Sequence, residues 1–191
     1  MYHPKVAKLI KKDSPKSKLI LIVCDPVKRA FSKWKEDHLD VKISNTTRFS
    51  QYFTLPNGSL NTKSFYIRFS HYAERVKPWL STFPRNKILI INGENVRKNP
   101  YPEILKAEKY LGLPKLVKKQ TFSKMVGRKF PCWKTYKGKK CFISQIKGRK
   151  HPETKGEVKL LVDKLREYFI PRNEEFFKLT GVKFNWSMDE A

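Results

Sequence analysis

The 191-residue chain lacks several features that would place it in a common class. Cysteine occurs only three times, which is too few for a disulfide-rich scaffold, and no Cys-x-x-Cys pair offers zinc spacing. No run of about 18 apolar residues and no signal-peptide pattern occurs, so we expect no transmembrane segment in this chain. A GxxxxGK[ST] loop is also missing, which argues against ordinary kinase and nucleotide-hydrolase sites.

Acidic residues are scarce as well. The 17 Asp and Glu residues against 42 Lys and Arg residues leave a net charge of +25. Hydrophobic residues make up 39% of the chain and aromatic residues 13%, enough to predict a folded protein of about one domain. A charge of this size indicates a polyanionic partner: nucleic acid, an acidic polysaccharide, an anionic membrane or a phosphate-bearing cofactor. Charge alone does not choose among them.

The apolar pattern predicts an α/β fold. Leu19–Val23 and Lys87–Ile91 are short branched runs typical of strands buried in a parallel sheet. Asp25 is the expected N-cap of a helix that continues to Asp37. Further helices are predicted over residues 64–83, 102–111, 152–169 and 174–179. Residues 5–18 read as a basic lead-in, 43–62 as an irregular connector, and 113–150 as a functional or disordered loop.

Four motifs follow one another in a fixed order: LIVCDPVKRAFS at 21–32, YAER to FP at 72–84, FPC to KGRKHP at 130–152, and PRN to FNW at 171–186. Together they resemble the sulfotransferase domain of the heparan sulfate 3-O-sulfotransferases. The resemblance implies a P-loop-like sulfotransferase fold, a parallel sheet flanked by helices, over residues 19–186. Residues 1–18 would then be a lead-in and 187–191 a tail.

The resemblance also implies an activity. Members of this family transfer a sulfuryl group from 3′-phosphoadenylyl sulfate, without a metal, to the 3-hydroxyl of glucosamine in heparan sulfate in the Golgi lumen. In a luminal chain the sequons at Asn45, Asn57 and Asn185 would be glycosylation sites.

Part of the donor site would lie at the first motif. A helix N-terminus after a buried strand is an anion site, and by family match Ser32 binds the 3′-phosphate of the donor. The family places an arginine where this chain has Cys24, which predicts weakened donor affinity. Arg29, one turn before Ser32, either compensates or is a solvated helix arginine. Cys24 itself is expected to be a small buried residue rather than a reactive thiol.

The third motif would supply the rest of the donor site. Its donor-binding segment matches Lys147, Gly148, Arg149, Lys150 and His151, although a solvated basic loop is the alternative. Pro131 stands where relatives place an aromatic residue against the adenine. Cys132 and Cys141 match the family's disulfide, although both thiols would remain unpaired in a reducing compartment.

By the family resemblance, the helix that carries Arg68, His71, Tyr72 and Arg75 would border the polysaccharide. Arg68 and Arg75 are the candidates for contacts with sulfates and carboxylates of heparan sulfate. His71 matches no motif, so we interpret it as a structural or surface histidine.

The family's glycine-rich phosphosulfate loop and its general-base glutamate have no counterpart before Leu19, because residues 1–18 contain no glycine. The sequence therefore predicts an N-terminally truncated domain with weak or no activity, no assignable base and an open edge on its first strand. Two alternatives remain: a non-catalytic heparan-sulfate-binding module and a nucleic-acid-binding protein. No RNA-binding aromatic motif, zinc spacing or basic dimer helix supports the second, so nucleic acid is not the expected partner.

Overall fold

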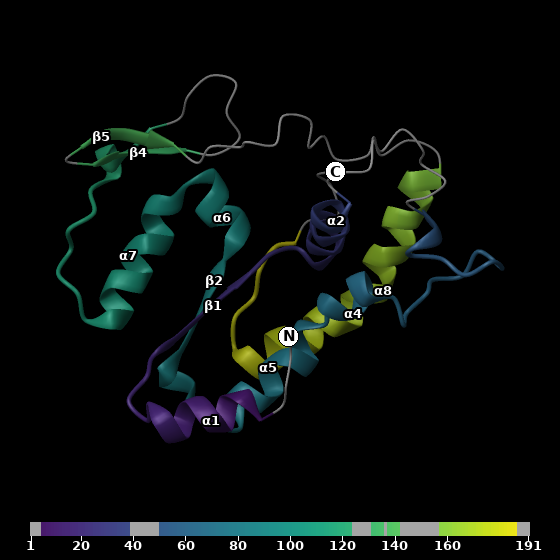
Figure 1. The fold of residues 1–191 in the computed structure, drawn as a ribbon, viewed down its shortest axis with the longest axis horizontal. Helices are drawn as coiled ribbons and strands as arrows, with labels where there is room; N and C mark the ends of the chain where they lie inside the picture. The colour runs from purple at the N-terminus through teal and green to yellow at the C-terminus, as the bar shows by residue number, and fades with distance from the viewer. Residues whose placement is uncertain (1–4, 39–49, 124–130, 136, 142–156, 187–191) are drawn as a thin grey trace. The chain divides into compact units, whose positions relative to one another are not determined.

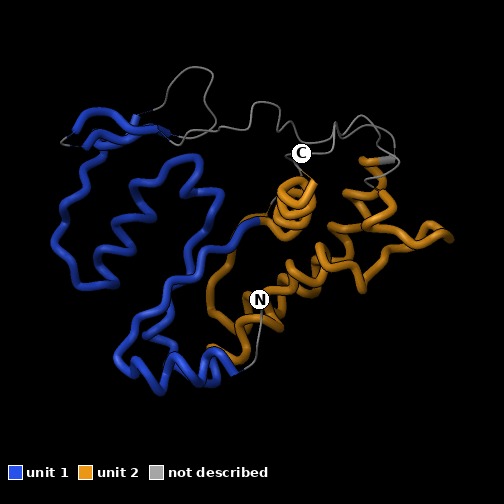
Figure 2. The backbone as a smooth tube through the Cα atoms, viewed as in Figure 1, with its two compact units in different colours: residues 1–24, 80–147 blue, residues 25–79, 148–191 orange. Residues whose placement is uncertain are grey.

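The computed structural model of the chain describes residues 5–38, 50–123, 131–135, 137–141 and 157–186 (Figure 1). The chain divides into two compact units (Figure 2). Unit 1 comprises residues 1–24 and 80–147, and unit 2 comprises residues 25–79 and 148–191. The first boundary, between Cys24 and Asp25, therefore lies between the first strand and the helix that follows it in sequence.

Two parallel strands form the first sheet of unit 1. β1 (Leu19–Val23) pairs with β2 (Ile88–Asn92), so that Leu19 lies opposite Ile88 and Val23 opposite Asn92. β1 coincides with its prediction, and β2 begins and ends one residue later than predicted. Among the described residues β1 pairs with β2 alone, so its second edge is open there. Ile20 and Ile22 on β1 are 40% and 58% exposed.

The helices of unit 1 follow local end signals. The short 3₁₀ helix η1 (Arg85–Lys87) leads into β2, which is followed by α6 (Gly93–Lys98) and α7 (Pro100–Leu111). α7 starts two residues earlier than predicted because Pro100 suits the first turn of a helix. It ends at Gly112, whose φ of 77° is the left-handed conformation that glycine adopts readily.

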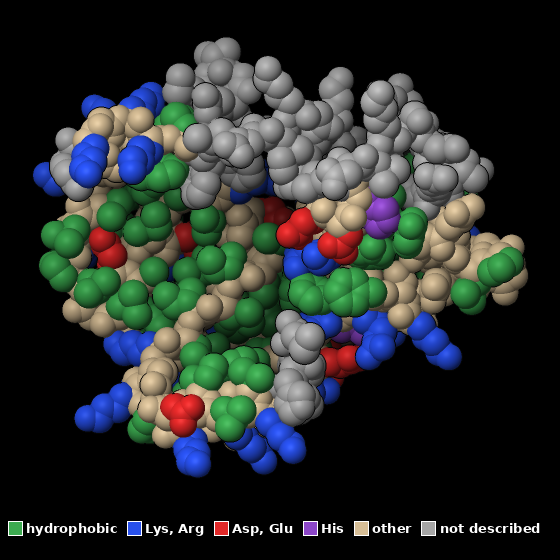
Figure 3. All heavy atoms as spheres, in the orientation of Figure 1, with side chains coloured by type: hydrophobic (Ala, Val, Ile, Leu, Met, Phe, Trp, Pro, Cys, Tyr) green, Lys and Arg blue, Asp and Glu red, His purple; other side chains and the backbone are tan. Residues whose placement is uncertain are grey.

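The basic lead-in is a helix rather than an unstructured segment. α1 spans Val6–Asp13, buries Ala7, and places the Lys11 ammonium 5.3 Å from the centre of the Phe83 ring. Figure 3 shows Lys and Arg side chains gathered along α1. No helix was predicted here, although α1 holds four apolar residues against three lysines.

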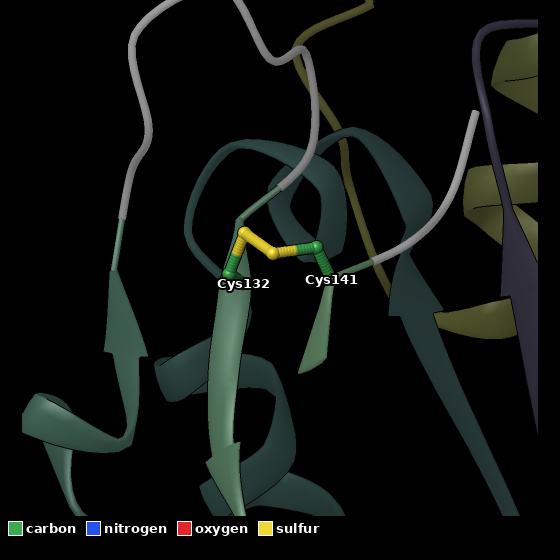
Figure 4. Close-up of a disulfide and its surroundings, with 2 residues drawn as sticks. All are labelled: Cys132 and Cys141. Atoms are coloured by element: carbon green, nitrogen blue, oxygen red, sulfur yellow. A yellow bond between two sulfur atoms is a disulfide. The ribbon is translucent and has the colours of Figure 1, made fainter. Parts of the chain in front are cut away.

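Part of the expected loop at 113–150 is a small antiparallel sheet. After η2 (Lys119–Thr121) come β3 (Phe122–Ser123), β4 (Cys132–Thr135) and β5 (Gly138–Cys141), in the order β3-β4-β5. Cys132 and Cys141 lie directly opposite each other, with their Cα atoms 4.1 Å apart, and form the disulfide that the family resemblance implied (Figure 4). The bridge and the positive φ of Gly138, 105°, specify a hairpin whose lysines have little strand propensity.

Unit 2 is helical around one apolar core. α2 (Pro26–Asp37) packs against α4 (Phe65–Phe69) and α8 (Glu157–Thr180), and α5 (Tyr72–Leu80) follows α4. The core contains residues from α2, α4, α8 and the connector before α4: Val27, Ala30, Phe31, Trp34, Phe53, Tyr66, Ile67, Val158, Leu161, Val162, Leu165 and Phe169.

Two helix predictions in unit 2 need correction. The helix expected over 64–83 breaks at Ser70, which donates its hydroxyl to the Tyr66 carbonyl at 3.3 Å and its N–H to Ile67 in a tighter turn. The two helices expected after residue 152 form one helix, α8, which continues through Pro171 and ends before Gly181. No helix in the described ranges is both long and apolar enough to cross a lipid bilayer.

The disulfide generates a stability prediction. Replacing both Cys132 and Cys141 by Ala lowers the free energy of unfolding of oxidised protein by about 2–3 kcal/mol, because the nine-residue separation no longer restricts the unfolded chain. Urea titrations of the oxidised wild type and the double variant measure this difference. Cys24→Ala, which removes a thiol outside the bridge, is the control. Equal unfolding midpoints for the wild type and the double variant would show that the bridge adds no stability.

Candidate functional site

The start of α2 is closed by its own cap. The Asp25 carboxylate accepts hydrogen bonds from the N–H groups of Val27 at 2.8 Å and Lys28 at 3.2 Å. Pro26 has no N–H, and the Arg29 N–H donates to the Asp25 carbonyl at 2.8 Å. Asp25 is thus the N-cap that the sequence predicted. The same cap corrects the expectation of an anion site at this terminus, because the first-turn N–H groups are already engaged.

Side chains of α2 remain available for an anion. Ser32 is exposed, and Arg29 is half-buried one turn earlier. Residues three apart on a helix lie on the same face, so the hydroxyl and the guanidinium share one side of α2. The core residues Ala30, Phe31 and Trp34 lie on the other side. Because Asp25 fixes where α2 begins, Ser32 and Arg29 lie on the side of the helix that faces away from the core.

An aromatic ring links the two sets of predicted site residues. The Arg29 guanidinium carbon lies 4.6 Å from the centre of the Phe69 ring, and that of Arg75 lies 4.5 Å from the same ring. Arg75 also donates from Nη2 to the Arg68 carbonyl at 3.2 Å, while the Arg68 side chain is exposed. Arg29, predicted for the donor, and Arg75, predicted for the polysaccharide, therefore meet within unit 2.

Sequence reasoning missed Phe69. Its spacing from Phe65 and Tyr72 marked it as one more apolar residue on a helix face, and the structure places it at the end of α4 with its ring half-buried. The sequence signal that could have identified Phe69 is its position beside Arg68 in a segment that also carries Arg75. The sequence around Phe69 does not indicate that Arg29 is near, because Arg29 lies on another helix.

The remaining predicted residues are only partly described. Cys24 is half-buried at the end of β1, where a Cβ added to Gly93 would overlap its sulfur atom. Pro131 is buried directly before β4. Lys147, Gly148, Arg149, Lys150 and His151 lie outside the described residues. Their assignment to the donor therefore stays a prediction.

His71 is a buried side chain with polar partners at the surface rather than part of an open site. Its Nδ1 lies 3.3 Å from Glu74 Oε1 and its Nε2 lies 3.1 Å from the Tyr168 hydroxyl. The Arg172 guanidinium covers the Tyr168 ring at 3.6 Å. Burial lowers the pKa of His71 and the positive charge of Arg172 adds to this, whereas Glu74 opposes it. These contacts agree with a structural histidine.

Metal ligands do not cluster in the part of the chain that is described. No group of three or more His, Cys, Asp and Glu side chains there has an arrangement that would hold an ion. The chemistry of the described site is that of guanidinium and hydroxyl donors, which suit phosphate or sulfate oxygens.

Comparison with known families identifies the chain. Residues 3–180 match the family model described as the sulfotransferase domain. The chain belongs to the sulfotransferase domain family. The sulfotransferase domain described above is thus α/β with a parallel sheet and flanking helices, as the motifs predicted.

Individual relatives match this sulfotransferase domain over most of its length. It is 30% identical over 178 residues to heparan sulfate glucosamine 3-O-sulfotransferase 3B1 of Mus musculus, covering 91% of this chain and 44% of that protein. It is 31% identical over 180 residues to heparan sulfate glucosamine 3-O-sulfotransferase 6 of Homo sapiens, covering 91% and 50%. The chain spans about half the length of these relatives.

A solved structure supports the same fold. The crystal structure of a sulfotransferase from Alicyclobacillus acidocaldarius superposes with a TM-score of 0.63 at 17% sequence identity. The alignment covers 97% of this chain and 63% of the bacterial one. At this identity the likeness concerns the fold of the sulfotransferase domain.

The cap of α2 generates a second prediction. Asp25→Ala removes the acceptor for two backbone donors and lowers the free energy of unfolding by about 1–2 kcal/mol, measured by chemical denaturation. Asp25→Asn keeps an accepting oxygen and is expected to lose less. If Asn destabilised the domain as much as Ala, the negative charge rather than the cap would be the important feature.

The buried histidine generates a third prediction. Because the pKa of His71 is lower in the folded state, its stabilising contribution is fully present above about pH 6.5 and is lost as pH falls below that value. His71→Gln removes the titrating group. The wild type is expected to lose more free energy of unfolding than this variant between about pH 7.5 and about pH 5.5. Parallel curves of stability against pH would contradict the assignment.

Proposed function

We propose that this sulfotransferase domain serves the transfer of a sulfuryl group from 3′-phosphoadenylyl sulfate to the 3-hydroxyl of glucosamine in heparan sulfate. This chain alone has weak or no activity in this proposal, because residues 1–18 contain neither a glycine-rich loop nor a glutamate. The observation that carries the proposal is the shared face of α2, where Ser32 matches the family's phosphate-binding serine and Arg29, the candidate to compensate for Cys24, lies one turn before it. The two relatives named above are both heparan sulfate glucosamine 3-O-sulfotransferases, and their names support the substrate.

The donor fits the residues at this face. When bound, 3′-phosphoadenylyl sulfate supplies the activated sulfuryl group. The Ser32 hydroxyl donates to an oxygen of the 3′-phosphate, and the Arg29 guanidinium adds charge-assisted donors. The loop residues Lys147, Gly148, Arg149, Lys150 and His151 supply further donors in this proposal, and Pro131 borders the adenine. With Cys24 in place of the family's arginine, donor affinity is weaker than in relatives that keep it.

The polysaccharide binds through positive charge. The net charge of +25 favours a polyanion, and Arg68 and Arg75 offer guanidinium donors to sulfates and carboxylates. Figure 3 shows further Lys and Arg side chains around β4 and β5. The disulfide suits an oxidising compartment, and we assign the domain to the Golgi lumen by analogy with the family.

A second candidate function is a non-catalytic heparan-sulfate-binding module. The specific observation in its favour is Cys24, since a thiol offers none of the bidentate donors that an arginine gives a phosphate. Such a module would use the basic surface and would need no sulfate donor. The two candidates therefore differ in whether the chain binds the nucleotide.

The fourth prediction separates these functions. Calorimetry is expected to show binding of adenosine 3′,5′-bisphosphate, the desulfated donor, and Ser32→Ala is expected to weaken it about tenfold by removing a hydrogen bond to a charged group. Ser14→Ala, which changes an exposed serine at the end of α1, is the matched control.

Transfer of labelled sulfate from the donor to heparan sulfate completes this test. Nucleotide binding with transfer supports the enzyme. Salt-sensitive heparin binding without nucleotide binding would favour the binding module. Tighter binding to duplex DNA than to heparin would contradict both.

A further inference from the structure

Phe69 holds two arginines from two other helices. Arg29 comes from α2 and Arg75 from α5, and both guanidinium carbons lie within 4.6 Å of the centre of the Phe69 ring at the end of α4. All three residues belong to unit 2. Cation–π contacts of this kind are attractive and orient the guanidinium against the face of the ring.

A guanidinium held in this way keeps its hydrogen-bonding capacity. Its five N–H donors lie in the plane of the group, so an aromatic contact does not consume them. Within the described part of the chain Arg29 enters no salt bridge, and its side-chain contact is the Phe69 ring. Arg29 therefore has a ring contact and, in this part of the chain, no ion pair that would occupy its donors.

Two other groups near the start of α2 offer an anion few hydrogen-bond donors. The backbone N–H groups of the first turn bond to Asp25, and the family's arginine position holds Cys24. The donors that α2 itself can offer an anion beside Ser32 are therefore side chains of the same helix face. Lys28 and Arg29 are cationic side chains one turn before Ser32, and Arg29 is the one that lies over the Phe69 ring.

We propose that Phe69 is a positioning residue that holds Arg29 for the 3′-phosphate of the donor and so replaces part of the binding lost at Cys24. This inference rests on the proposed donor binding and extends it to a residue that does not touch the ligand. Arg75, on the same ring, adds positive potential. Two guanidiniums on one ring repel each other, and a bound phosphate offsets that repulsion.

The fifth prediction concerns the ring itself. Phe69→Leu removes the aromatic face and is expected to weaken binding of adenosine 3′,5′-bisphosphate about fivefold, as measured by calorimetry. Phe69→Tyr keeps the face and is expected to retain wild-type affinity. Phe65→Leu, which changes a neighbouring exposed ring on α4, is the matched control and is expected to leave affinity unchanged.

A double-mutant cycle separates positioning from general structure. If Phe69 acts through Arg29, Phe69→Leu has no further effect on affinity once Arg29→Ala is present, whereas additive losses would overturn the proposal. Arg29→Lys, which keeps the charge and loses the fork, tests the same contact if Phe69→Leu fails to fold. It is expected to weaken binding, and unchanged affinity in this variant would also overturn the proposal.

The remaining outcomes distinguish this inference from the proposed function. If Ser32→Ala weakens nucleotide binding and Phe69→Leu does not, the positioning role is wrong and donor binding stands. A loss confined to heparin oligosaccharides would assign the two arginines to polysaccharide sulfates and overturn the proposal. Wild-type protein that binds no nucleotide would overturn both.

Discussion

The hydrogen bonds from the first turn of α2 to Asp25 determine how the rest of the site is arranged. They fix the residue at which the helix begins after β1. The starting residue of a helix determines which of its side chains lie on which side. Ala30, Phe31 and Trp34 then point into the core of unit 2, while Arg29 and Ser32 share the opposite side. The same bonds occupy the backbone donors of the first turn, so the proposed anion recognition on α2 depends on side chains.

In unit 2 the Arg29 guanidinium contacts an aromatic ring rather than a carboxylate. A carboxylate beside Arg29 would fix the guanidinium but would also neutralise it and occupy its donors. The Phe69 ring attracts the guanidinium through its face and does not neutralise its charge. The approach of Arg75 to the same ring concentrates positive charge there, which is useful in a protein whose expected ligands are phosphates and sulfates.

In unit 1 a disulfide stabilises a hairpin that is rich in lysine. The β4–β5 hairpin carries several lysines, whose mutual repulsion and low strand propensity disfavour pairing. The Cys132–Cys141 bridge joins directly opposite residues and offsets that disadvantage. The charged hairpin can therefore remain ordered while it presents its lysines at the surface.

Much of the secondary structure and the family membership follow from the local sequence. Branched apolar runs give β1 and β2, and Asp25 with Pro26 gives the start of α2, because strand burial and helix capping depend on neighbouring residues. The family resemblance gave the disulfide, which composition did not show. Ordering of the lysine-rich segments was missed. In α1 the local propensity of Ala, Leu and Lys favours the helix, whereas in β4–β5 the bridge outweighs a low strand propensity.

The assembly of Arg29, Phe69 and Arg75 depends on tertiary structure alone. These residues are separated by tens of positions or lie across the break at Ser70, and no periodic pattern relates three different helices. Packing of α2 against α4 brings the first two together, and the turn into α5 returns the third to the same ring. Residue types and motif order thus follow from the chain itself, whereas the shared aromatic contact is decided by how the helices of unit 2 pack.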